Sequence, residues 1–334
     1  MATTGESTNL FRCANEPSSA IGWGASPLPP VRLRLCCWFA RWFRWLTDAE
    51  PTLFGSGMKV ITTDKDRFRN GAKDYAAYLG TFEGRLRTDL AFANLEDRVS
   101  RRLTTSQSLS ALDVGGGTGT TAVRLASLGL HVTLLDSSKE MLEIAQTQAR
   151  KAGVENKVAL QLGDAMQLAS LYPRQSFDAV LCHNILEYLE DPMPVLRGAA
   201  RALRDSSALL SILVRNQSGE VLKSALQSGD LVRAKKDLSA EWGQESLYGG
   251  KVRLFTPDGL RAMLKAATLV PISEQGVRVL ADYLPPRVSR GADYSQIFDL
   301  ERQLSVRPEF AAIARYTQYF AHNSETMAES SCIE

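Results

Sequence analysis

The stretch that decides the fold is Leu112-Asp113-Val114-Gly115-Gly116-Gly117-Thr118-Gly119, which follows a short apolar run and opens a helical pattern. A strand that turns through glycines into a helix places backbone N–H groups and a positive dipole end beside a ligand. Glycine is needed there because a Cβ would block close approach and because such turns use positive φ. The next predicted strand ends in Asp136, where a carboxylate accepts hydrogen bonds from both ribose hydroxyls. The stretch therefore predicts a site for an adenosine-type ligand.

Short apolar strands alternate with helical patterns around this stretch. Such alternation is typical of an α/β fold, in which helices cover both faces of a parallel sheet. Ligands of such sheets bind beyond the carboxyl ends of the strands, where the strand order reverses. We expect strands at 109–114, 131–135, 158–162, 177–182, 208–214, 270–279 and 314–321, and helices at 85–101, 120–128, 139–152, 192–203, 256–266, 294–304 and 308–313.

Composition and charge restrict the class of protein. The 334 residues carry a net charge of +2, so the whole chain is not a strongly basic nucleic-acid binder, although a local basic face would suffice for RNA. The five cysteines are odd in number and lack zinc-ligand spacing, which predicts free thiols, a cytoplasmic location and no metal. The apolar segment 31–46 is too short and too charged to span a bilayer, so we expect no transmembrane segment.

Three segments lie outside the regular pattern. We expect 1–57 to be disordered or a mis-annotated leader, with Met58 as the true start, and 324–334 to be a disordered tail. Within the remaining domain, 58–323, residues 215–254 form a long polar connection that interleaves basic with aromatic residues. This insert suits either an RNA contact or a solvated lid.

The glycine spacing distinguishes between cofactors. A dinucleotide fingerprint reads Gly-x-Gly-x-x-Gly, and counting from Gly115 or Gly117 does not give its last glycine. The series Asp113, Gly115, Gly117 and Gly119 instead resembles motif I of the class I S-adenosylmethionine (SAM) methyltransferases. This resemblance implies a Rossmann-like fold with a mostly parallel seven-stranded sheet, SAM as cofactor, and a loop that wraps the methionine part of SAM.

A narrower resemblance lies around the fourth predicted strand and in the C-terminal half. Its motifs are Cys182-His183-Asn184-Ile185-Leu186-Glu187-Tyr188, Gly276-Val277-Arg278-Val279, Asp282-Tyr283-Leu284 and Arg315-Tyr316. These are similar to the bacterial tRNA 5-carboxymethoxyuridine methyltransferases, which esterify the carboxylate of a modified wobble uridine. The resemblance covers about 64–321 and implies tRNA as a partner. Carried over residue by residue, its SAM contacts fall on Arg87, Gly115, Gly116, Asp136, Ala165, Met166 and His183.

Further candidates concern adenine and the methyl acceptor. Asp164 follows the third strand and either accepts a bond from the adenine amino group or caps the next turn. A carboxylate acceptor is already ionised at neutral pH, so we assign no catalytic acid or base and expect catalysis by positioning and exclusion of water. The acceptor should meet an arginine, whose planar fork matches a carboxylate. The candidates are Arg253, Arg278 and Arg315.

Other functions fit the same residues. The pocket could methylate an O or N atom of a small metabolite, in which case the chain would have no tRNA affinity. A non-catalytic SAM- or RNA-binding module would hold its ligand without transfer, although the intact motif I argues against it. An enzyme tethered to a membrane surface by 31–46 requires that this segment be translated.

Overall fold

The computed structural model describes residues 64–324 except 104–107, 246, 248–249 and 285–292. All described residues belong to the second of two compact units, Val60–Glu334. The predictions for 1–57 and for nearly all of 324–334 therefore lie outside the described residues.

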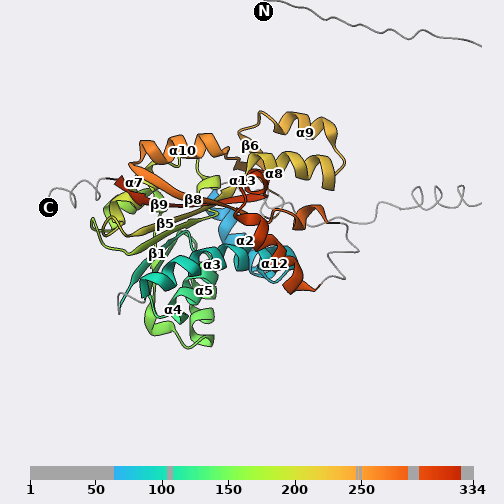
Figure 1. Cartoon of the computed structure of the whole chain (residues 1–334). Coiled ribbons are helices and arrows are strands. Elements are labelled where there is room, and N and C mark those ends of the chain that lie inside the picture. The colour runs from blue at the N-terminus through green and yellow to red at the C-terminus, as the bar shows by residue number, and fades with distance from the viewer. Residues whose placement is uncertain (1–63, 104–107, 246, 248–249, 285–292, 325–334) are drawn as a thin grey trace, which may run out of the picture. The chain divides into compact units, whose positions relative to one another are not determined.

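A seven-stranded sheet in the order β3-β2-β1-β4-β5-β9-β8 organises this unit (Figure 1). The strands from β3 to β5 are parallel, whereas β9 pairs antiparallel with both β5 and β8. The mostly parallel sheet predicted from the sequence is thus confirmed. The strands are β1 Ser110–Val114, β2 His131–Asp136, β3 Val158–Leu162, β4 Ala179–His183, β5 Leu209–Arg215, β8 Leu269–Val277 and β9 Tyr316–Asn323.

Helices cover both faces of the sheet (Figure 1). One face packs against α3 (Phe82–Leu103), α4 (Thr120–Ser127) and α5 (Lys139–Lys151). The other packs against α6 (Leu168–Leu171), α7 (Met193–Ala202) and α10 (Pro257–Ala266). Successive side chains of a strand point to opposite faces, so a strand that is covered on both faces consists mostly of apolar residues. In β1, the residues from Ala111 to Val114 are all buried, and Asp113 is the one polar residue among them.

Local signals set several helix ends. The Ser138 side chain accepts the Met141 N–H at 3.2 Å and begins α5, and Gly153 follows that helix with φ +69°. The Thr256 side chain accepts the Gly259 N–H at 3.1 Å at the start of α10. These short-range caps agree with the predicted helix boundaries.

Two segments form structure that the sequence periodicity does not indicate. The aromatic stretch before α3 is a helix, α2 (Asp64–Leu79). The insert at 215–254 has its own elements, as long connections usually do: α8 (Gln217–Leu222), the π-helical turn η4 (Lys223–Gln227), α9 (Leu231–Asp237), and a hairpin of β6 (Trp242–Gln244) and β7 (Lys251–Arg253). The remaining elements are η1 Glu155–Lys157, η2 Ala165–Gln167, η3 Leu186–Tyr188, η5 Ala281–Tyr283, α12 Tyr294–Ser305 and α13 Pro308–Ala311.

The strand order creates one crevice. From β1 the chain moves outward to β2 and β3 and then returns to β4 on the other side of β1. The carboxyl ends of these four strands meet at the point of reversal, where sheets of this kind bind ligands. In the described ranges, none of the helices has the length and hydropathy needed to cross a membrane.

Candidate functional site

The loop after β1 turns at three glycines with positive φ, the third being Gly119 (φ +79°) at the start of α4. Gly115 has φ +66° and Gly117 has φ +55°, which other residues adopt with strain. The Gly115 N–H donates to the Leu135 carbonyl at 2.7 Å, and a Cβ on Gly115 would overlap Ile185. The Gly117 N–H donates to the Asp136 carboxylate at 2.9 Å. These bonds fix the loop against β2.

Asp136 ends β2 beside this loop. Its Oδ2 accepts the Gly117 N–H, and its Oδ1 accepts the Ser138 N–H at 2.8 Å. Burial raises the pKa of Asp136, whereas the backbone donors of Ser138 and Gly117 oppose that rise. A carboxylate oxygen has two lone pairs, so each oxygen can accept a further bond from a ligand hydroxyl.

A cavity of about 250 Å³ lies at the carboxyl edge of β1 to β4. Leu135, Met141 and Ile185 give it apolar walls, and a few polar side chains converge on it, which is typical of a small-molecule site. Eight of the predicted residues line it: Arg87, Gly115, Gly117, Asp136, Asp164, Ala165, Met166 and His183.

The other predicted residues lie beside this cavity. Asp113 and Gly116 line a smaller cavity of about 40 Å³ that shares Arg87 and His183 with the first. Gly119 lines neither cavity; a Cβ there would press against Ala145 of α5, so this glycine permits close helix packing.

The smaller cavity places a buried acid near a cation. Burial, and then Asp136, raise the pKa of Asp113 to about 7. The Oδ2 of Asp113 is buried and has no hydrogen-bond partner among the described residues. Arg87 contributes a cation to the same cavity. An acid near a cation is the chemical complement of an amino-acid group, which carries one ammonium and one carboxylate.

Arg87 projects from α3 and is almost fully buried. It donates to the Tyr75 hydroxyl at 3.1 Å, and its guanidinium lies 5.6 Å from the Tyr316 ring centroid. Burial opposes its charge, but Tyr75, Tyr78 and Tyr316 outweigh burial and raise the pKa of Arg87. The residue therefore stays cationic inside the site.

His183 ends β4 and lines both cavities. Burial, and then Arg87, lower the pKa of His183 to about 3, so its ring is neutral at physiological pH. Asn184 follows with φ +53°, and its side chain donates to the Glu187 carboxylate at 3.0 Å. This left-handed residue turns the chain from β4 into the wall of the pocket.

Asp164 serves as a cap and also lines the pocket. Its Oδ1 accepts the Met166 N–H at 3.0 Å, which begins η2. The turn predicted as the alternative to an adenine contact is therefore present, and the same carboxylate still faces the cavity.

Several aromatic residues of the pocket were not assigned from the sequence. Phe68 and Tyr75 come from α2, and Tyr188 comes from η3. The Phe68 and Tyr188 rings meet edge to face with centroids 5.0 Å apart. The only sequence feature that could have indicated them is the aromatic content of the segment before α3. That content is as typical of a segment packed on the sheet as of a lid over a ligand.

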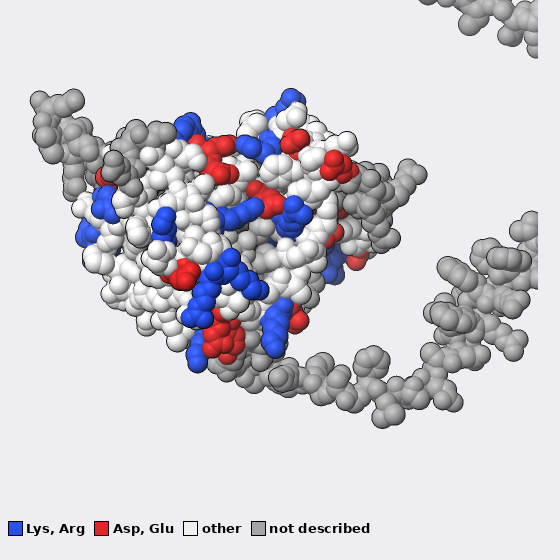
Figure 2. Space-filling view, turned by 90° about the horizontal axis from the view of Figure 1, so that it is seen from below, with Lys and Arg blue, Asp and Glu red and all other residues white. Residues whose placement is uncertain are grey.

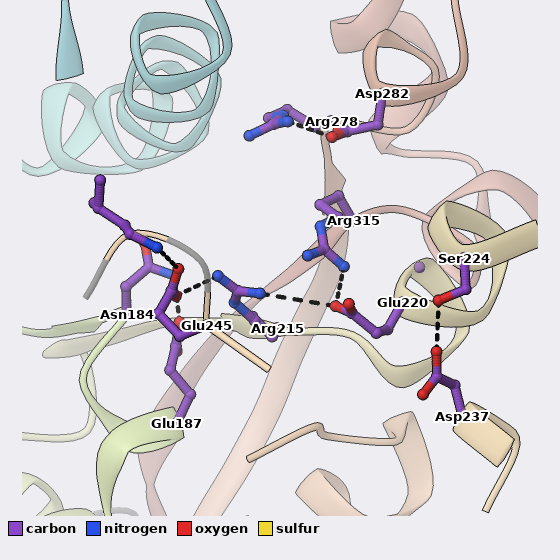
Figure 3. Close-up of polar contacts among 12 residues, drawn as sticks. Asn184, Glu187, Arg215, Glu220, Ser224, Asp237, Glu245, Arg278, Asp282 and Arg315 are labelled. Atoms are coloured by element: carbon purple, nitrogen blue, oxygen red, sulfur yellow. Dashed lines mark hydrogen bonds and ion pairs between the residues drawn. The ribbon is translucent and has the colours of Figure 1, made fainter. Parts of the chain in front are cut away.

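The three arginines proposed for the acceptor line neither cavity. Arg278 pairs with Asp282, and Arg315 pairs with Glu220, all four side chains being buried (Figure 3). Arg253 donates to the backbone carbonyl of Glu190 at 2.7 Å and lies 4.6 Å from the Trp242 ring centroid.

Arg215, Glu220 and Glu245 form a buried ion-pair network (Figure 3). Arg215 ends β5 between Glu245, at 2.5 Å, and Glu220, at 3.7 Å. Burial raises the pKa of Glu187 to about 7, although Arg215 opposes the rise. The network joins the insert to β5.

Comparisons with known proteins agree with this geometry. Residues 105–265 match the family model described as "Methyltransferase domain". The tRNA 5-carboxymethoxyuridine methyltransferase of Escherichia coli is 27% identical over 254 residues, which cover 74% of this chain and 92% of the relative. The 27-O-demethylrifamycin SV methyltransferase of Amycolatopsis mediterranei is 31% identical over 61% of this chain and 68% of the relative. The solved CcbJ methyltransferase of Streptomyces caelestis has a TM-score of 0.53 at 16% identity and covers 78% of this chain and 100% of that chain.

Proposed function

Since the chain belongs to the class I SAM-dependent methyltransferases, with SAM as its cofactor, we propose that it methylates the carboxylate of 5-carboxymethoxyuridine at the tRNA wobble position to a methyl ester. The similarity to the tRNA-modifying relative supports this acceptor because it extends over 92% of that protein's length. The similarity to the rifamycin relative covers a smaller share of each chain.

SAM supplies an activated methyl group, and the residues of the two cavities would hold the cofactor. We assign Asp136 to the ribose hydroxyls and Arg87 to the methionine carboxylate. Asp113 would accept the methionine ammonium, because its buried Oδ2 lacks a partner among the described residues. Apolar Leu135 and Ile185 would enclose the adenosine part.

The choice of acceptor rests on the similarity to the tRNA-modifying relative, and the neutral histidine of the pocket agrees with it. A general base has to accept a proton near the working pH, and a His183 pKa of about 3 makes this ring a poor one. Glu187 has a pKa of about 7, but it does not line the pocket. Its carboxylate accepts a hydrogen bond from Asn184, which does line the pocket. An alcohol or phenol acceptor would need such a base, whereas an ionised carboxylate needs none.

Charge on the insert supports an RNA partner. On α9, Arg233, Lys235 and Lys236 are exposed. On the hairpin, the Lys251 ammonium lies 4.2 Å from the Trp242 ring centroid, a combination of cation and aromatic that suits a nucleic-acid strand. The insert also exposes Asp230 and Glu241, and basic and acidic side chains are likewise mixed on the face seen from below (Figure 2).

The test uses the full chain with methyl-labelled SAM and bulk tRNA from cells that lack this activity. Label recovered in a base-labile ester of 5-carboxymethoxyuridine, identified by mass spectrometry after digestion, is the expected result. tRNA without the carboxymethoxy group serves as the control and should stay unlabelled.

Two other outcomes would contradict the proposal. Bound SAM without labelled tRNA, but with label on a small metabolite, would indicate a small-molecule methyltransferase. Bound SAM without transfer to either pool would indicate a binding module.

A further inference from the structure

A chain of buried polar side chains extends from the Nε2 of His183. The His183 Nε2 lies 2.8 Å from the Ser211 Oγ, and the Gln318 Nε2 donates to that same oxygen at 3.1 Å. The Gln318 Oε1 in turn accepts from the Asn94 side chain at 3.0 Å. The chain runs from β4 through β5 and β9 to α3, and its last three side chains are almost fully buried.

A backbone carbonyl fixes the direction of every bond in this chain. The Gln318 Nε2 lies 3.0 Å from the Ala91 carbonyl oxygen, which can only accept, so the amide presents its NH₂ there. The second N–H of that amide points to the Ser211 Oγ. The Ser211 hydroxyl proton is then left for His183 Nε2, because the described residues offer Ser211 no other acceptor.

A neutral imidazole that accepts at Nε2 carries its proton on Nδ1. The opposite tautomer would direct two donors at the Ser211 oxygen and leave the buried hydroxyl proton without an acceptor. Among the described residues the Nδ1 of His183 has no partner, although the ring lines both cavities. The Nδ1–H is therefore available to a ligand.

We propose that Asn94, Gln318 and Ser211 are positioning residues that hold His183 as the neutral Nδ1–H tautomer, a fixed hydrogen-bond donor to an anionic oxygen of the methyl acceptor. This inference rests on the proposed function and deepens it. It assigns the His183 donor to the acceptor, whereas the resemblance to the tRNA-modifying family implies a contact with SAM, and the kinetic test below distinguishes the two. The low pKa of His183 agrees with this role, since the ring does not become a cation at working pH.

Nitrogen NMR of histidine-labelled protein tests the tautomer directly. The chain has only three histidines, so the His183 signals are assigned by one substitution, His183→Gln. We expect a pyrrole-type shift at Nδ1 and a pyridine-type shift at Nε2 at neutral pH. The reverse pattern, or a charged ring, in the wild type would overturn the proposal.

Two variants test the direction of the chain. Ser211→Ala should remove the preference for one tautomer and mix the two ring-nitrogen shifts. Gln318→Glu replaces the amide donor by an acceptor, so Ser211 should donate to residue 318 and His183 should move to the Nε2–H tautomer. Ser224→Ala is the matched control, because it removes a buried hydroxyl that bonds to Asp237 in the insert. Unchanged shifts in Ser211→Ala and Gln318→Glu would overturn the assignment.

Kinetics test what the donor contacts. Gln318→Glu, which moves His183 to the Nε2–H tautomer, should raise the KM for the acceptor about tenfold, the loss of one hydrogen bond to a charged group. Ser211→Ala, which only mixes the tautomers, should raise it about twofold. The Kd of SAM should change by less than about twofold. Weaker SAM binding with an unchanged acceptor KM would overturn the assignment to the acceptor. Because the NMR measurement needs no acceptor, failure of this tautomer and failure of the tRNA activity are separate results.

Discussion

At the carboxyl edge of β1 and β2, backbone N–H groups donate hydrogen bonds to the polar side chains. Around Arg215, by comparison, charged side chains form ion pairs with one another. Asp136 accepts from Gly117 and Ser138 of the adjoining loops. Arg215, by contrast, depends on Glu220 of α8 and Glu245 of the insert. The first arrangement follows from glycine positions in one short stretch. The second includes the pair of Glu220 with Arg315, which directly precedes β9 in the chain, so it is complete only when distant parts of the chain have met.

The buried network and an exposed ion pair should differ most in how much each contributes to the free energy of unfolding. Arg215→Met should lower the free energy of unfolding by about 3–5 kcal/mol, because it leaves the buried Glu245 carboxylate without its cation, whereas Glu220 keeps its pair with Arg315. Arg302→Met, which removes a pair with Asp97 between partly exposed side chains, should cost less than about 1 kcal/mol. Urea denaturation measures both, and equal losses would contradict a special role for the network.

The pH dependence of stability tests the buried acid of the loop. The pKa of Asp113 is raised to about 7 in the folded state, so between about pH 4 and pH 7 folded protein keeps a proton that unfolded protein has released. The free energy of unfolding should therefore fall as pH rises through this window. Asp113→Asn should flatten that fall by about 2–4 kcal/mol. Parallel curves for the two proteins, from denaturation without SAM, would show that Asp113 ionises normally.

The ribose assignment predicts a loss of SAM affinity. Asp136→Ala should weaken SAM binding by about 1–3 kcal/mol in calorimetry, since ligand hydroxyls would lose their acceptor. Asp205→Ala is a matched control. Like Asp136, Asp205 accepts the backbone N–H of the residue two positions later, here Ser207 at 2.8 Å, but Asp205 precedes β5 and lies at the amino edge of the sheet. SAM affinity that is equal in both variants would remove Asp136 from the site.

The smallest expected effect concerns Glu187. If the acceptor is a carboxylate, Glu187→Gln should change the rate of methyl transfer by less than about threefold, because no proton has to be removed. General-base catalysis is worth about a hundredfold or more, so a loss of that size would favour an acceptor that must be deprotonated. Single-turnover kinetics at two pH values separate these outcomes.

The part of the site that follows from short stretches of sequence could be predicted. Gly115 and Gly117, with positive φ, stand where motif I places them, and Asp136 ends its strand beside them. These positions depend on strand and turn preferences that act over a few residues. Asp113 is the exception within this stretch, because its raised pKa comes from burial, which a sequence does not display.

The rest depended on contacts between distant segments. The aromatic wall from α2 and the left-handed Asn184 have no periodicity that marks them. Arg278 and Arg315 were proposed as acceptor contacts from residue type alone, and the carboxylates that pair with them lie on η5 and α8. Charge by itself does not reveal which arginines have a partner.

The place of β9 has a consequence for the order in which the chain folds during synthesis. β9 lies between β5 and β8, although it is the last strand along the chain among the described residues. Until it arrives, β5 is an edge strand whose backbone groups are open to pairing with other chains. A chain that stops before Tyr316 would keep this edge and would also lack Gln318, so premature termination should yield aggregates. Pairing with β9 should therefore remove an edge that exposes the domain to misassembly.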